Sequence, residues 1–117
     1  MEDIQIQDFK IVRGDTWKRE LEFYSDSGET NITGWTIFLT AKEKISDADS
    51  SAKISKTITV HTEPLNGKTQ ITLSSAETNL PIGSYVYDIQ FKTATGDVTT
   101  ILTGTITILS DVTQRTS

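Results

Sequence analysis

One segment dominates the pattern of this sequence: Leu80-Pro-Ile-Gly-Ser-Tyr-Val-Tyr-Asp-Ile-Gln-Phe91. Large apolar and aromatic side chains fill every second position of its second half, and Val86, Asp88 and Gln90 stand between them. Successive side chains of a strand point to opposite faces, so this alternation predicts a strand with one buried face. We expect it to be the central strand of an all-β domain. Its predicted inward-facing side chains are Tyr85, Tyr87, Ile89 and Phe91.

Similar alternation recurs on both sides of this segment and predicts six more strands. The first of them has a slip in parity near Asp8, which is typical of a β-bulge. In the last, Gly104 interrupts the apolar pattern and indicates either a bulge or a close approach of another backbone. That last strand is expected to turn Val98, Leu102, Ile106 and Ile108 inward. The six predicted strands are 4–11, 16–24, 35–44, 54–60, 69–73 and 98–109.

The connections carry recognisable turn chemistry. Asn66-Gly67 between two alternating runs predicts a hairpin that joins the fourth and fifth strands. The polar segment 46–51 is expected to be a loop bridging the two sheets of a sandwich. Ser74 with Glu77 three residues later predicts a capping box that opens a single helical turn, which Pro81 must end.

About seven short strands separated by turns is the number found in an immunoglobulin-like sandwich. Two further features agree with that fold. Tyr85 follows the helical turn where such folds place a corner tyrosine, and Trp35 opens the third strand, where they often bury a tryptophan. The predicted fold is therefore an all-β, immunoglobulin-like β-sandwich of about seven antiparallel strands with one short helical turn. We expect a single domain over 1–117, with an ordered core of about 4–110 and a loose tail from Asp111.

Composition narrows the possible functions. None of the 117 residues is Cys, so disulfides, thiol catalysis and Cys-based zinc sites are excluded. The net charge of -5 argues against a surface that neutralises phosphates, so no nucleic-acid partner is expected. No apolar run reaches the length of a membrane span, and the acidic N-terminus is unlike a signal peptide. We expect a soluble protein of the cytoplasm, or one released by means other than secretion, with no membrane partner.

The titratable residues do not assemble into a catalytic or metal site. His61 is the only histidine and has no accompanying nucleophile signature, so we interpret it as a solvated residue at a strand end. Asp47 and Asp49 have oxygens suited to Ca²⁺, but Ala52 and Ile58 occupy the positions where a calcium loop needs Gly and Glu. The prediction is no enzyme activity, no cofactor and no metal.

Two patterns suggest adhesion and have simpler structural interpretations. Arg13-Gly14-Asp15 spells an integrin-recognition tripeptide, and it is also a normal tight turn, which we favour. Trp17 and Trp35 are large enough to form an aromatic platform for a sugar, but their parity places them on inner faces. A core role is therefore expected for both tryptophans.

Several motifs follow one another over about residues 9–113: Arg13-Gly-Asp-Thr16, Asn31-Ile-Thr-Gly34, Leu73-Ser-Ser-Ala-Glu-Thr-Asn-Leu80, Gly83-Ser-Tyr-Val-Tyr-Asp88, Gly96-Asp-Val-Thr-Thr-Ile101, Gly104-Thr-Ile-Thr-Ile108 and Asp111-Val-Thr113. Their order and spacing resemble those of bacteriophage tail and baseplate proteins, especially the N-terminal domain of the phage baseplate upper protein family.

The resemblance implies an immunoglobulin-like attachment domain that holds other virion proteins. We therefore expect a non-enzymatic virion structural protein of the tail, baseplate or neck, present in the host cytoplasm before assembly. Its expected partners are other virion proteins and further copies of itself, because virion parts repeat about symmetry axes. The alternatives are a carbohydrate-binding or host-adhesion module and a head decoration protein. The residues predicted to make protein contacts lie in two loops: Ser46, Asp47, Asp49, Ser50, Thr93, Thr95 and Asp97.

Overall fold

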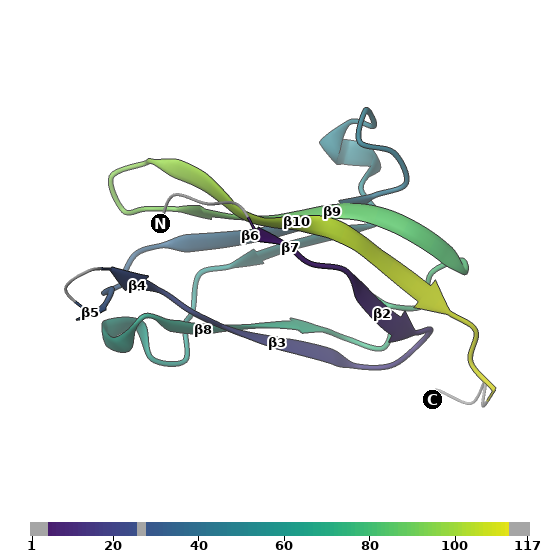
Figure 1. Ribbon diagram of the computed structural model, residues 1–117, viewed down its shortest axis with the longest axis horizontal. Coiled ribbons are helices and arrows are strands. Elements are labelled where there is room, and N and C mark those ends of the chain that lie inside the picture. The colour runs from purple at the N-terminus through teal and green to yellow at the C-terminus, as the bar shows by residue number, and fades with distance from the viewer. Residues whose placement is uncertain (1–4, 26–27, 113–117) are drawn as a thin grey trace.

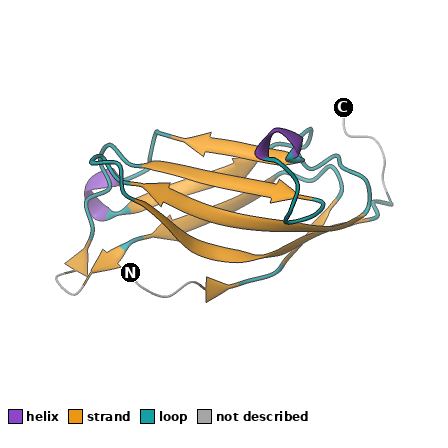
Figure 2. Ribbon diagram, turned by 90° about the horizontal axis from the view of Figure 1, so that it is seen from above, coloured by secondary structure: helices purple, strands orange, loops and turns teal. Residues whose placement is uncertain are grey.

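The computed structural model describes residues 5–25 and 28–112, and it confirms an all-β sandwich. Figure 1 shows two layers of strands, and Figure 2 looks down on the larger layer. The larger sheet has six strands in the order β1-β10-β9-β6-β7, with β2 continuing beside β10 after β1. The smaller sheet contains only β3 and β8, and β4 pairs with β5 in a separate hairpin.

The strands of the larger sheet are β1 (Gln5–Ile6), β2 (Phe9–Val12), β6 (Thr36–Lys42), β7 (Ile54–Ile58), β9 (Gly83–Lys92) and β10 (Val98–Leu109). The smaller sheet is formed by β3 (Trp17–Glu22) and β8 (Lys68–Leu73). The separate hairpin is β4 (Tyr24–Ser25) with β5 (Gly28–Glu29). Two short 3₁₀ helices complete the described chain, η1 (Asp49–Ser51) and η2 (Pro64–Asn66). The pairing is not wholly antiparallel as predicted, because β1 and β2 both run parallel to β10.

The predicted central strand is central. β9 pairs with β10 on one side and with β6 on the other, and its four predicted inward side chains are all buried. They pack against the inner faces of β6 and β10 in the larger sheet and of β8 in the smaller one. Removing such a side chain from water stabilises the fold by about 1.5–3 kcal/mol. The large apolar side chains that are fully buried on these three strands are Ile37, Leu39, Ile71, Leu73, Ile106 and Ile108.

The corner before β9 forms as the sequence predicts. The backbone N–H of Glu77 donates to Ser74 Oγ at 3.2 Å, and Glu77 Oε1 accepts from the backbone N–H of Ser74 at 2.8 Å. A backbone hydrogen bond from Thr78 to Ser74 closes one helical turn at 3.1 Å. The hydroxyl of Tyr85 then donates to the carbonyl of Pro81 at 2.6 Å, which confirms the corner tyrosine.

The β-bulge predicted near Asp8 is wrong, because β1 and β2 follow β10 in one constant register, with Ile6 beside Thr103 and Phe9 beside Ile106. Ile6 is 80% exposed, so it does not belong to the inner face.

No strand is assigned at Gln7 and Asp8, where the chain lies against Gly104 of β10 and the backbone N–H of Gln7 donates to the carbonyl of Thr103 at 2.9 Å. A Cβ atom at Gly104 would lie 2.2 Å from the carbonyl oxygen of Gln7, and its φ of 153° is one that other residues rarely adopt. The carboxylate of Asp8 accepts a hydrogen bond from the backbone of Thr105 at 3.0 Å. Gly104 therefore marks a close backbone approach.

The predicted inner face of β10 is wrong at its start. The pairing of β10 with β9 shifts between Thr100 and Leu102, which is a β-bulge at Ile101. The bulge reverses parity, so Val98 pairs with Lys92 on the outer face and is 56% exposed. Ile101 and Leu102 are both buried as a result.

Two predicted connections are also wrong. The Asn66-Gly67 turn does not join paired strands, because β7 pairs with β6 and β8 pairs with β3. Gly67 instead ends the 3₁₀ helix η2, and only the single pair Glu63 and Lys68 forms across the turn. The loop at 46–51 joins the neighbouring strands β6 and β7 of one sheet, so it does not bridge the two sheets.

Candidate functional site

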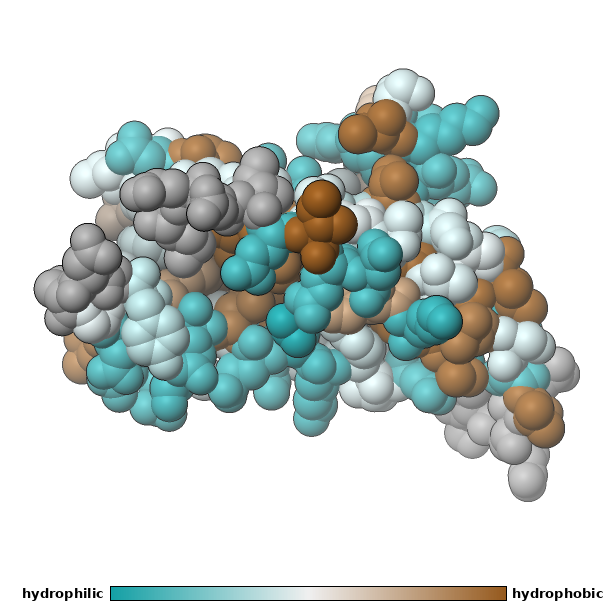
Figure 3. Space-filling view, in the orientation of Figure 1, coloured by the Kyte–Doolittle hydropathy of each residue, from teal (hydrophilic) through white to brown (hydrophobic). Residues whose placement is uncertain are grey.

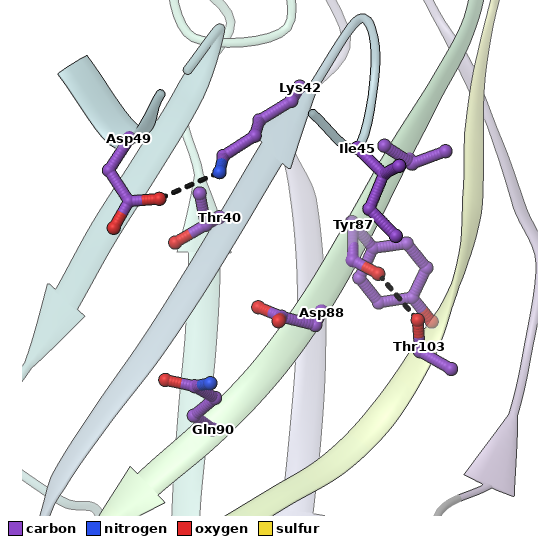
Figure 4. Close-up of a pocket in the computed structure, with 9 residues that line it drawn as sticks. Thr40, Lys42, Ile45, Asp49, Tyr87, Asp88, Gln90 and Thr103 are labelled. Carbon is purple, nitrogen blue, oxygen red and sulfur yellow. Dashed lines mark hydrogen bonds and ion pairs between the residues drawn. The ribbon is translucent and has the colours of Figure 1, made fainter. Parts of the chain in front are cut away.

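The outer face of the larger sheet carries a small pocket beneath the loop of residues 43–53 (Figure 4). Strands β6, β9 and β10 form its floor, and the loop forms one wall. The volume of the pocket is about 150 Å³, which is enough for the end of one side chain. In Figures 1 and 3 this loop stands out from the body of the molecule. The lining residues are Thr40, Lys42, Ile45, Asp49, Val86, Tyr87, Asp88, Gln90 and Thr103.

Lys42 at the end of β6 holds the loop in place. Its ammonium group lies 2.7 Å from Asp49 Oδ1 and donates to the backbone carbonyl of Asp47 at 2.8 Å. The side chain of Asp47 accepts from the backbone N–H of Lys44 at 3.2 Å. Two of the predicted contact residues therefore shape the loop. The oxygens of Asp47 and Asp49 that the sequence suggested for Ca²⁺ are instead occupied in part by the ammonium group of Lys42.

Asp88 lies in the pocket without a hydrogen-bonding partner among the described residues. It is half-buried in the middle of β9, and this burial raises the pKa of its carboxyl group. Lys42 lowers that pKa and Asp49 raises it, but both charges are already paired with each other. Gln90 uses its amide N–H to reach Thr100 at 3.2 Å, so its carbonyl oxygen stays free to accept.

This arrangement suits a cationic side chain from another protein. A lysine or arginine entering the pocket would meet one unpaired carboxylate together with hydroxyl and amide oxygens. The alternation of β9 places Asp88 on the outer face, but the sequence contains no sign of the loop that half-buries it. The pocket is therefore a structural finding.

The second predicted contact segment, 93–97, is the hairpin turn between β9 and β10. Thr93 receives the backbone N–H of Asp97 on its hydroxyl at 3.1 Å, and its own hydroxyl lies 3.0 Å from that of Thr95. Thr36 pairs with Lys92 at this end of the sheet, whereas Lys42 lies at the other end. The structure therefore places the two predicted contact segments at opposite ends of a molecule 46 Å long. Of the predicted residues, Asp49 alone lines the pocket.

His61 is not the solvated residue predicted from the sequence. It is half-buried, and its Nε2 lies 2.8 Å from the carbonyl oxygen of Trp35, the residue that precedes β6 in the chain. Its Nδ1 lies 2.8 Å from the hydroxyl of Thr69, a fully buried residue of β8. A carbonyl oxygen only accepts, so Nε2 carries a proton. His61 therefore links the two sheets.

The tryptophans have the core role that was expected. Trp35 stacks on Phe91 with ring centroids 4.5 Å apart and also contacts Phe23. Trp17 meets Phe9 edge to face at 5.1 Å. Neither ring lies open on a flat outer face, which is the arrangement that a sugar platform requires.

The Arg13-Gly14-Asp15 segment is a turn, as we favoured. The backbone N–H of Asp15 donates to the carbonyl of Val12 at 3.0 Å. The guanidinium of Arg13 lies 3.5 Å from Asp111, whose side chain is only 10% exposed. Asp111, the first residue of the predicted loose tail, is therefore held against the domain, and residues 113–117 lie outside those described.

Within residues 5–25 and 28–112, no three His, Asp or Glu side chains are grouped closely enough to hold a metal ion. No helix in the same residues has the length and apolar character needed to cross a bilayer.

The fold defined by these features is an immunoglobulin-like sandwich with a pocketed outer sheet face. Among solved structures it is similar to the N-terminal domain of phage TP901-1 ORF48, with a TM-score of 0.53. The two share 11% sequence identity over 92% of this chain and 90% of the other. The expected resemblance to a bacteriophage N-terminal domain is thus confirmed at the level of the fold. No protein-family model and no curated protein sequence matches the chain.

Proposed function

We propose that this chain is a non-enzymatic structural protein of a bacteriophage virion, acting in the tail, baseplate or neck by binding other virion proteins. The observation that carries the proposal is the structural likeness to the phage N-terminal domain over nearly the full length of both chains. The sequence motifs point the same way, because their order resembles the N-terminal domain of the baseplate upper protein family.

The pocket at Asp88 supports a role in protein association. A half-buried carboxylate with no partner costs desolvation energy unless a cation binds it. Titratable groups with a pKa perturbed by burial cluster at functional sites. The pocket has room only for the end of a side chain. In this proposal, a lysine or arginine of a neighbouring virion protein enters beneath the 43–53 loop and pairs with Asp88.

The test is quantitative mass spectrometry of gradient-purified phage particles from the source, with this chain measured against the major capsid protein. The proposal predicts recovery in particles at a fixed, low copy number that matches the symmetry of a tail, baseplate or neck. A copy number near that of the capsid protein would instead indicate head decoration. Absence from the particles, with the chain left free in the lysate, would overturn the structural role.

The carbohydrate-binding alternative has its own test. Adding host cell-wall polysaccharide to the purified protein should leave the fluorescence of Trp17 and Trp35 unchanged, because both rings pack against other aromatic residues. Saturable quenching would favour the adhesion module over the structural role.

A further inference from the structure

The free edges of the two sheets are protected unequally. A free strand edge exposes unpaired backbone groups, and proteins protect such edges with breaks, charges or inward-pointing charged residues. In the larger sheet, the β1–β2 edge is broken at Gln7 and Asp8. The other edge, β7, points Lys56 inward opposite buried Leu39, where it pairs with Glu77 at 3.1 Å.

In the smaller sheet the two edges differ in charge. The positions whose backbone groups face away from β8 on β3 are Lys18, Glu20 and Glu22, so this edge carries three charges in a row. The corresponding positions on β8 are Lys68, Gln70 and Thr72. Of the four free edges of the larger and smaller sheets, the β8 edge has the least protection.

The hydrogen-bond pattern shows which groups of β8 are open. The backbone N–H of Phe23 donates to the carbonyl of Gly67 across the β3–β8 pair. Residue pairs in an antiparallel ladder alternate between hydrogen-bonded and non-hydrogen-bonded pairs. Gln70 and Thr72 therefore point their backbone N–H and C=O groups away from β3. Lys68, two residues earlier, confirms this alternation because both its backbone groups bond outward to Glu63 at 3.0 and 3.1 Å. Among the described residues, nothing continues this pairing past Lys68.

The side chain of His61 explains why the pairing stops. In a regular hairpin, the residues before Glu63 would continue to pair with β8. His61 instead hydrogen-bonds to the backbone carbonyl of Trp35, and the strand before it, β7, belongs to the larger sheet. This crossing from one sheet to the other leaves an opening of about 300 Å³ between β7 and β8. Val60 borders it and is 85% exposed.

We infer that the β8 edge binds a second copy of this chain through antiparallel β8–β8 pairing. The edge is self-complementary in one register, where Gln70 of each copy faces Thr72 of the other. That register uses all four open backbone groups on each copy, whereas a shift by one pair would meet Lys68 or Ser74, whose groups are occupied. The side chains brought opposite one another are an uncharged amide and a hydroxyl, which can hydrogen-bond.

The position where β8 ends also favours the second copy. In this register Ser74 of one copy would lie opposite Lys68 of the other, whose outward backbone groups are bonded to Glu63. Because Ser74 begins the helical turn and leaves the line of the strand, the partner strand ends before it reaches Glu63. The result would be a four-stranded sheet, β3-β8-β8-β3, across a two-fold axis. This inference deepens the proposed function by naming one of its association surfaces.

Sedimentation velocity of the purified full chain over a range of concentrations tests the inference. The wild type should form a dimer. Gln70→Lys with Thr72→Lys should raise the dissociation constant at least about tenfold, because like charges then face each other in both pairs. Gln70→Lys with Thr72→Glu should restore dimerisation, because the same register then pairs opposite charges between the copies. Within each copy the new charges lie opposite Glu20 and Lys18, which also carry the opposite sign.

A matched control is Ala94→Lys with Ser110→Lys, which adds the same charge at exposed positions away from β8 and should leave dimerisation unchanged. Circular dichroism of each variant verifies folding. A wild type that stays monomeric at every concentration would overturn the second copy as occupant. Equal dimerisation by the double-lysine variant, or no rescue by the Lys/Glu pair, would overturn the register. Neither result depends on whether the chain is found in phage particles, so the two proposals can fail separately.

Discussion

The two sheets of this sandwich differ in the number of their strands and in how well their free edges are protected. In the larger sheet, the central strand β9 has partners on both sides and the free edges are broken or guarded. The smaller sheet has only two strands, and a two-stranded sheet is marginal in water without packing against another layer. The difference indicates a division of roles. The larger sheet supplies most of the stability and the pocket, and the smaller sheet supplies an edge for association.

The largest loss of stability is expected from a substitution that disturbs the β1–β2 edge of the larger sheet at Gly104. Gly104→Val should lower the free energy of unfolding by about 3–4 kcal/mol, since the side chain would collide with the backbone of Gln7 and the φ is unfavourable. Gly96→Val is the matched control. Gly96 also has a positive φ, but open space surrounds it, so only about 1 kcal/mol should be lost. Urea denaturation measures both, and equal losses would contradict the close approach.

Alkaline pH should weaken the hydrogen bond that Tyr87 makes to this edge and lower stability by a smaller amount. Burial raises the pKa of Tyr87 to about 12, and its hydroxyl donates to the carbonyl of Gln7 at 2.6 Å. A tyrosine of the unfolded chain has a pKa near 10.0, so the stability that neutral Tyr87 provides is complete below pH 10 and is lost as pH rises toward 12.

Urea midpoints measured across this pH range should therefore fall in the wild type and fall less in Tyr87→Phe. Because other tyrosines also ionise here, the difference between the two proteins is the informative quantity. An identical decline in both would show that Tyr87 does not anchor the edge.

The corner before β9 offers a smaller change within the larger sheet. Tyr85→Phe should cost about 1 kcal/mol, because it removes the hydrogen bond to the carbonyl of Pro81 while keeping the buried ring. Tyr24→Phe, at an exposed tyrosine in the separate hairpin, should have little effect. Thermal unfolding compares the pair, and a larger cost at Tyr24 would be incompatible with the corner's role.

The smallest expected change is an increase in stability at the pocket. Burial raises the pKa of Asp88, so its charged form is disfavoured in the folded state, and Asp88→Asn should slightly raise the urea midpoint at neutral pH. The gain should vanish below about pH 4, where the wild-type carboxyl is protonated in both states. Glu20→Gln, on the exposed outer face of the smaller sheet, should show no gain. A loss of stability in Asp88→Asn would mean that Asp88 has a partner within the domain.

Local patterns in the sequence predict much of the larger sheet. The alternation from Tyr85 to Phe91 identifies the central strand, and Ser74 with Glu77 identifies the helical turn, because both signals depend on neighbouring residues. The bulge at Ile101 escapes prediction because the apolar residues on either side of it fit one uninterrupted alternation. Residues 9–12 also give no sign that their strand runs parallel to β10, since the connection is long-range.

The features that matter for association were the hardest to predict. Asn66-Gly67 has the composition of a hairpin turn, but the crossing made by His61 sends the preceding strand to the other sheet. The open edge of β8 results from that crossing, so it is visible only once the pairing is known. The same holds for Asp88, which becomes half-buried when a loop from β6 folds over it.

Residue-resolved amide hydrogen exchange at low and high protein concentration tests the contrast between the two edges most directly. The prediction is that the amides of Gln70 and Thr72 exchange quickly in dilute protein and become protected as concentration rises. The outward amides of Glu20 and Glu22 on β3 should exchange quickly at both concentrations. Unchanged exchange at Gln70 and Thr72, or protection that appears on β3 instead, would contradict the assignment of β8 as the associating edge.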